Sequence, residues 1–205
     1  GDDGELRMLY VPVTTAQPTA ATFLGVHDHD DRLEDLSEQG DATYRAALSA
    51  VAAELDALEP TLPGDADRVT ASLLRHQLEV AITSIDLRLV ELASDQMLGP
   101  HASLLMMAPQ LTYPEPGHAE AALIRYSQVP RLLGQALDRF RAGVAEGRPP
   151  AASVLARTLN TLDGYLAGPI ESDPFLAPGL PEDWDGAAAW RAGAAELVRD
   201  RIRPA

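Results

Sequence analysis

The spacing of apolar residues is the feature that most restricts the fold of this chain. Apolar residues recur three and four positions apart almost throughout, and the alternation typical of a half-buried strand is nearly absent. The longest series is Leu74, Leu78, Ile82, Ile85, Leu89 and Leu92, and its opposite face is polar, as an amphipathic helix requires. Three further series are Leu48–Val51–Leu55–Leu58, Leu133–Leu137–Phe140–Val144 and Leu155–Leu159–Leu162–Leu166. The pattern predicts an all-α protein whose apolar stripes face a common core.

Capping residues and prolines divide the pattern into five or six helices. We expect Ser37 to precede one helix and Asp65 to cap another, and we expect a break or kink at Val129-Pro130 because proline clashes with the preceding turn. Residues 94–116 and 168–186 are rich in proline and carry no sustained period, which indicates two long loops. Because no repeat or linker interrupts the chain, the sequence predicts a single domain over residues 1–205, an irregular helical bundle.

Composition excludes several classes of function. The formal net charge of -15 repels phosphate backbones and anionic lipid, so we expect neither nucleic acid nor a membrane as partner. Cysteine is absent, which excludes disulfides, thiolate metal sites and a cysteine nucleophile. The stretch GDDGELRMLYVPV lacks the basic start and apolar core of a signal peptide, and no apolar run reaches the roughly 18 residues of a membrane span. We therefore expect a cytoplasmic location.

The stretch HDHDD, residues 27–31, is the most suggestive local motif. In an extended chain His27 and His29 would point the same way, and histidine with carboxylate is a common ligand set for zinc or iron. No spacing fixes a third ligand, and a calcium-binding loop is excluded because Leu33 stands where glycine is required. Three interpretations stay open: a solvated turn that caps the next helix, a cleft-lining segment and a self-contained metal site. The turn is the preferred one.

The remaining motifs favour no catalytic site. His118 in YPEPGHAE lacks the H-E-x-x-H arrangement and is interpreted as part of a helix start, with Glu120 favoured in the first turn by the helix dipole. His76 and His101 are isolated and are interpreted as packing or surface residues. No G-x-S-x-G and no phosphate-binding glycine loop occur. From the residues alone we assign no catalytic residue and no metal ligand to this chain.

Several segments, in order, resemble one bacterial family, the domain of unknown function number 885. They are PTAATFLGVHDHDDRLEDLS, LLRHQLEVAI, YSQVPRLLGQALDRFRAGVAEGRPP, DPFLAPGLP and VRDRIRPA. Members of that family are similar to zinc metallopeptidases of the H-E-x-x-H type, are mostly helical and are longer than this chain. Gly25, His27 and Asp30 match positions of the family's amino-terminal motif. The resemblance implies that these three residues line a cleft or support the ligands of a metal.

The resemblance also implies where the chemistry lies. The family's zinc motif, His-Glu followed by Pro-Gly-His-His, belongs to a carboxy-terminal half that this sequence does not contain. EPGH at residues 115–118 lacks the leading histidine and falls in another region, so it receives no metal role. The leading hypothesis is therefore an amino-terminal helical scaffold and cleft wall of a zinc-dependent peptidase or amidohydrolase, not catalytic alone. The complementary half or subunit would be the partner and would carry the zinc, and the substrate would be peptide-like.

Two further expectations accompany this hypothesis. A chain that normally pairs with a second half should expose an apolar strip, which we expect to involve Trp184, Trp190 or Leu197. The alternative is a stand-alone helical binding or regulatory module without enzymatic activity, in which every helix is fully buried.

Overall fold

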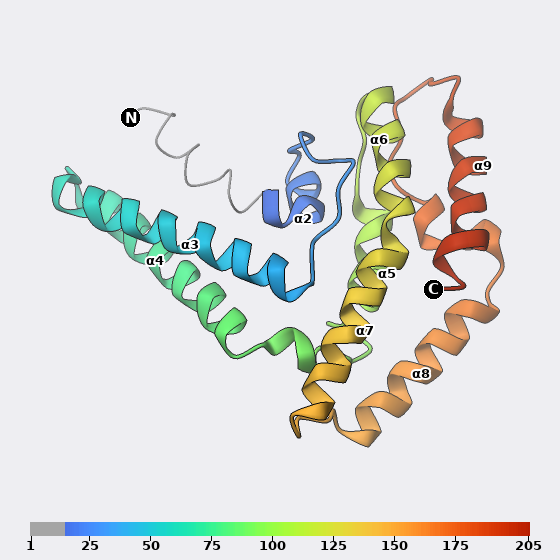
Figure 1. Cartoon of the computed structure of the whole chain (residues 1–205). Helices are drawn as coiled ribbons and strands as arrows, with labels where there is room; N and C mark the ends of the chain where they lie inside the picture. The colour runs from blue at the N-terminus through green and yellow to red at the C-terminus, as the bar shows by residue number, and fades with distance from the viewer. Residues whose placement is uncertain (1–14) are drawn as a thin grey trace.

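The computed structural model describes residues 15–205, and helices dominate that part of the chain (Figure 1). The α-helices are α2 (Pro18–Phe23), α3 (Glu38–Leu58), α4 (Asp65–Asp86), α5 (Pro100–Met107), α6 (Pro116–Ser127), α7 (Val129–Ala145), α8 (Ala152–Ala167) and α9 (Ala187–Leu197). Short 3₁₀ turns join them, and a π turn over Val198–Ile202 continues α9. No strand occurs among the described residues, so the all-α prediction is confirmed. The helices outnumber the expected five or six because the short α2 and α5 are added, α5 inside the first predicted loop.

The helix boundaries test the capping predictions. Ser37 caps α3, since its hydroxyl accepts a hydrogen bond from the Gly40 backbone N–H at 3.0 Å. The predicted break at Val129-Pro130 is confirmed, because α6 ends at Ser127 and α7 begins at Val129. The prediction for Asp65 is wrong. Gly64 is the N-cap, and Asp65 is already the first helical residue of α4, where it makes no side-chain cap.

The apolar series that starts at Leu74 is shorter in the structure than in the sequence. The helix α4 ends at Asp86, and Arg88 adopts left-handed backbone angles with φ of 52°. That conformation redirects the chain, so Leu89 and Leu92 leave the stripe and are exposed. A prediction from apolar periodicity alone extends the helix through this turn, because the apolar spacing persists beyond it.

The main core gathers around α6, α9 and the second proline-rich connection. Tyr126 meets Phe175 and Trp190 edge to face, with ring centroids 4.9 Å and 6.0 Å apart. The indole Nε1 of Trp190 donates to the Ala119 carbonyl, and this side chain is only 2% exposed. The expectation that Trp190 belongs to an exposed strip is therefore wrong. Trp184 and Leu197, named with it, also pack against this core.

A second, smaller core lies between α3 and α4. It contains Leu48, Val51, Leu55, Ala71 and Leu78, all of which except Ala71 belong to the predicted stripes of these helices. The two helices form a hairpin that projects away from α6 and α9 (Figure 1). At the base of the hairpin Arg45 donates to both carboxylate oxygens of Asp86, at 2.6 Å and 3.1 Å.

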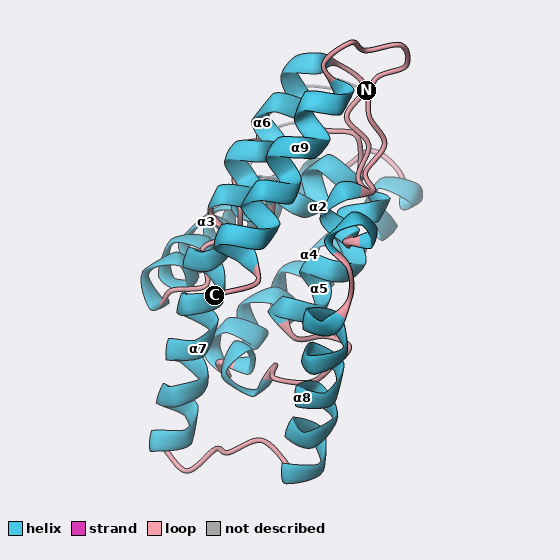
Figure 2. Ribbon diagram, turned by 90° about the vertical axis from the view of Figure 1, so that its right-hand side faces the viewer, coloured by secondary structure: helices cyan, strands magenta, loops and turns pink. Residues whose placement is uncertain are grey.

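The helices α7 and α8 depart from their predicted orientation. On α7 the buried residues are Val129, Leu132, Ala136, Arg139 and Gly143, one position before the predicted stripe. On α8 only Thr158 is buried, although its leucines were expected to face inward. Figure 2 shows α7 and α8 side by side but separated along most of their length. Five members of the two predicted stripes line a common space instead, namely Leu133, Leu137 and Phe140 of α7 and Leu162 and Leu166 of α8.

This space is an apolar groove with a volume of about 440 Å³. We define the α7–α8 groove by Leu105, Leu137, Phe140, Leu162, Tyr165 and Leu166, all of which line it. Leu137 and Leu166 are each 47% exposed, so the groove is open to solvent.

None of the helices in residues 15–205 is both long enough and apolar enough to cross a membrane. The segment GDDGELRMLYVPV, judged above for signal-peptide features, lies outside the described residues.

His101 in α5 should make stability depend on pH. Burial lowers the pKa of His101 from 6.5, and the nearby Asp95 carboxylate partly opposes that shift. The unfolded chain therefore binds a proton that the folded chain refuses, and stability is lost as pH falls below about 6.5 toward the folded pKa. We expect the melting temperature to fall between about pH 7.5 and about pH 5.5, and His101→Gln to reduce that fall. Melting curves by circular dichroism test this, and identical pH slopes for the two proteins would refute it.

Candidate functional site

The site is built on the loop over residues 24–36, which connects α2 to α3. Gly25 ends α2 in the left-handed region, with φ of 82°. The backbone N–H groups of Gly25 and Val26 then donate to the carbonyls of Thr22 and Ala21, each at 2.9 Å, which closes the helix terminus. A side chain at Gly25 would strain this backbone. The structure thus gives Gly25, one of the three predicted site residues, a role in turning the chain.

Asp30 is the buried carboxylate of this loop, only 2% exposed. Its Oδ1 accepts a hydrogen bond from the Thr22 hydroxyl at 2.5 Å, and its Oδ2 lies 2.8 Å from His27 Nδ1. A buried carboxylate is tolerated only when its oxygens are paired in this way. Asp30 therefore fixes the orientation of the His27 imidazole, whose side chain remains 16% exposed.

Arg125 of α6 fastens the loop from the other side, and its side chain is 2% exposed. Its guanidinium donates to Arg32 O at 2.7 Å, Thr22 Oγ1 at 2.7 Å, His29 O at 2.8 Å and Pro18 O at 3.3 Å. It also approaches Asp30 Oδ1 at 3.5 Å. One cation thus satisfies polar groups of both α2 and the loop, and compensates the buried charge of Asp30.

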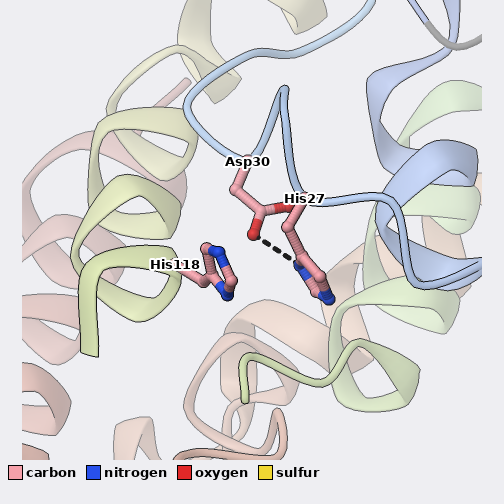
Figure 3. Close-up of side chains that lie close together, drawn as sticks. All are labelled: His27, Asp30 and His118. Atoms are coloured by element: carbon pink, nitrogen blue, oxygen red, sulfur yellow. Dashed lines mark hydrogen bonds and ion pairs between the residues drawn. The ribbon is translucent and has the colours of Figure 1, made fainter. Parts of the chain in front are cut away.

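His118 reaches the same place from the first turn of α6. Its imidazole stacks on that of His27, with ring centroids 4.4 Å apart and planes 11° from parallel. One potential ligand atom from each of His27, Asp30 and His118 lies within 4.8 Å of the others (Figure 3). We call these three residues the His–Asp–His cluster. It is the one group of three such side chains found within residues 15–205.

His29 does not join the cluster. Its Nε2 lies 3.3 Å from Thr15 Oγ1, and its carbonyl serves Arg125. The chain turns over residues 28–31, so side chains two positions apart no longer share a face as they would in an extended segment. The pairing of His27 with His29 that extended geometry suggested is not formed.

Two tyrosines stand close to this network. Burial raises the pKa of Tyr113 to about 12, and the charge of Arg125 partly offsets that effect. Burial likewise raises the pKa of Tyr126 well above its ordinary value of 10.0. Both phenols are therefore neutral at physiological pH and act as hydroxyl groups. The Tyr113 backbone N–H donates to Gly179 O at 2.8 Å, which ties the two proline-rich connections together.

Sequence reasoning found His27 and Asp30 but missed His118 and Arg125. A signal existed for Arg125, because it follows Ala122 and precedes Val129 on one helical stripe whose other members are apolar and buried. A charged residue on such a stripe needs a buried partner. For His118 the spacing offered nothing, since its neighbours come from a loop distant in sequence.

A comparison with protein families matches residues 18–205 to the model described as a bacterial protein of unknown function, DUF885. The chain belongs to the DUF885 family. The match spans α2 to α9, so it includes the loop of residues 24–36 and the whole His–Asp–His cluster. No curated protein matches the chain. Because the description of DUF885 names no activity, a function for this DUF885 chain has to rest on the chemistry of its own residues.

Proposed function

We propose that this DUF885 chain is the amino-terminal helical scaffold and cleft wall of a zinc-dependent peptidase or amidohydrolase, and that it is not catalytic alone. The observation that carries the proposal is the exposure of α8. This helix buries only Thr158, whereas Leu155, Leu159 and Leu166 are 37%, 60% and 47% exposed. Each buried leucine contributes about 1.5–3 kcal/mol, so a helix with this stripe in water lacks its normal cover.

The partner that fits is the complementary carboxy-terminal half or subunit, whose own helix would lie in the α7–α8 groove. The groove presents leucine and aromatic side chains from both helices, which suits an apolar helical face. The sequence contains no His-Glu followed by Pro-Gly-His-His, so we assign the zinc and its ligands to the complementary half. A zinc ion there would activate water for hydrolysis of a peptide-like amide.

On this side of the cleft, the chain would contribute the His27 imidazole. Asp30 holds the ring by Nδ1, and Thr22 with Arg125 holds Asp30, so the ring is oriented before any substrate arrives. Such an imidazole is suited to hydrogen bonding with a substrate amide or its leaving group.

The alternative, a stand-alone helical binding module, requires every helix to be fully packed. The exposure of α8 argues against it, because three of the four leucines in the apolar stripe of that helix are exposed.

A pairing experiment tests the proposal. The chain is expressed together with a carboxy-terminal half that carries His-Glu followed by Pro-Gly-His-His, and we expect a one-to-one complex that hydrolyses peptide amides while the isolated chain does not. Leu166→Asp should weaken pairing by about tenfold or more without changing the helix content, because Leu166 of α8 lines the groove and is 47% exposed. Leu73→Asp is the matched control, because Leu73 is 62% exposed on α4, which contributes no residue to the groove.

Two outcomes would overturn the proposal. One is peptide cleavage by the isolated chain, with contaminating proteases excluded. The other is equal pairing by the Leu166→Asp and Leu73→Asp variants, measured by analytical ultracentrifugation.

A further inference from the structure

We propose that the His–Asp–His cluster binds one divalent transition-metal ion of the zinc type, on this chain itself. The ligands are one nitrogen each of His27 and His118 and the Oδ2 of Asp30. This site shares His27 with the proposed cleft wall but does not depend on the pairing of α8 with a second half, and it departs from the sequence-based expectation that the chain holds no metal.

The donor set is the first support. Two imidazoles and one carboxylate are a preferred ligand combination for zinc and its neighbours among the transition metals. Three protein ligands leave the fourth tetrahedral position to water. The three side chains come from the loop after α2 and from the first turn of α6, two segments that Figure 3 shows converging on one point.

The distances are the second support. Zinc bonds of about 2.0 Å at the tetrahedral angle place ligand atoms about 3.3 Å apart. In the cluster His27 Nδ1 and Asp30 Oδ2 are 2.8 Å apart, and all three ligand atoms lie within 4.8 Å of one another. An ion can replace the proton between His27 and Asp30 if His118 moves inward by up to about 1.5 Å.

His118 is free to make that movement. The His27 and His118 rings are 11° from parallel, and a metal must lie near the plane of each ring that binds it, so one ring has to turn. His27 is held by Asp30, whereas His118 Nδ1 is buried without a hydrogen-bond partner in the described structure. Turning His118 thus breaks no bond and gives an orphaned nitrogen a partner.

The supporting residues favour the same assignment. Thr22 donates to Asp30 Oδ1, and Arg125 approaches that same oxygen, so the carboxylate is fixed while Oδ2 faces the histidines. The guanidinium charge opposes a second cation, yet it is directed at Oδ1 and at carbonyls of the loop and α2. Carboxylates and histidines that are locked in this way by neighbouring groups are characteristic of metal sites.

The test uses the metal-free full chain and Zn²⁺ alone. We expect isothermal titration calorimetry to show one ion per chain, and saturating zinc to raise the melting temperature by about 5 °C or more. His27→Ala and His118→Ala should each weaken binding by tenfold or more. His29→Ala, from the same loop but outside the cluster, and His76→Ala, on exposed α4, should leave it unchanged.

The His118 variant keeps the test independent of folding. His118 makes no side-chain hydrogen bond, so its removal should preserve the melting temperature of the metal-free protein, which Asp30 variants would not. NMR of the imidazole nitrogens should show zinc shifting His27 and His118 but not His76. If the unmodified chain and a His27→Ala/His118→Ala double variant bind zinc with equal affinity, the proposed site is wrong. It is also wrong if His29→Ala alone abolishes zinc binding. This experiment measures zinc binding and not pairing with the carboxy-terminal half. Its outcome therefore does not decide the pairing experiment on α8.

Discussion

Replacing Arg125 by alanine should lower the free energy of unfolding by about 3–5 kcal/mol, the usual effect of removing one partner of a buried ion pair. The side chain is 2% exposed and makes four hydrogen bonds to α2 and to the loop of residues 24–36. Its loss leaves the Asp30 carboxylate buried without a cation and leaves several acceptors unsatisfied. The loop, and His27 with it, should lose its fixed position on α6.

Urea unfolding measures this effect, and backbone hydrogen exchange in residues 24–36 locates it. Arg141→Ala is the control, because Arg141 lies on exposed α7 surface with its side chain 69% exposed. Its pair with Asp138 is solvated, so the unfolding midpoint should hardly change. Arg125→Lys should be nearly as damaging as alanine, since an ammonium cannot reproduce the planar guanidinium contacts. A midpoint for Arg125→Ala equal to that of Arg141→Ala would show that the buried network adds no stability.

Replacing Glu91 by alanine should have a comparable effect, again about 3–5 kcal/mol. Glu91 lies in the 3₁₀ turn over Leu89–Leu92 and is 1% exposed. Its carboxylate faces Arg139 at 3.4 Å and also contacts Arg148. Without it, the buried Arg139 side chain keeps only Asp41, at 2.6 Å, as an ionic partner.

The comparison with glutamine separates charge from shape. Glu91→Gln keeps the volume of the side chain but removes its negative charge. The side chain packs closely against Gly143, since a Cβ atom added to that glycine would lie only 3.0 Å from the Glu91 Cβ. We expect an intermediate loss in urea unfolding for this variant. Glu79→Ala, on the exposed face of α4, is the control and should be nearly neutral. If Glu91→Ala also leaves the free energy of unfolding unchanged, and no anion binds in place of the carboxylate, the buried ion network has no stabilising role.

The elements of the fold that follow from local rules could be predicted from the sequence. The all-α class, the helix boundary at Ser37 and the break at Val129-Pro130 depend on periodicity, one hydroxyl and one proline ring. The face that each helix buries does not follow from such rules. On α7 two apolar stripes adjoin, and only the packing of the whole chain decides that Leu132 faces the core while Leu133 faces the groove.

The candidate site was predictable only in part for a related reason. The motif drew attention to His27 and Asp30, which are three residues apart and meet through a local turn. His118 and Arg125 reach them across a distance that no short-range pattern encodes. His118 lies in a helix start with no distinctive sequence pattern. The charge of Arg125 can be buried only because Asp30 and three backbone carbonyls of the loop and α2 lie within reach of its guanidinium.

The position of Arg125 has one further consequence. The same guanidinium that completes the interior also secures the carboxylate beside His27, so the loop cannot loosen without disturbing the cluster. Ion binding at the cluster and ordering of the loop are then thermodynamically linked, and such linkage is reciprocal. Whatever steadies the loop must raise the affinity for an ion, and an ion must steady the loop by the same free energy.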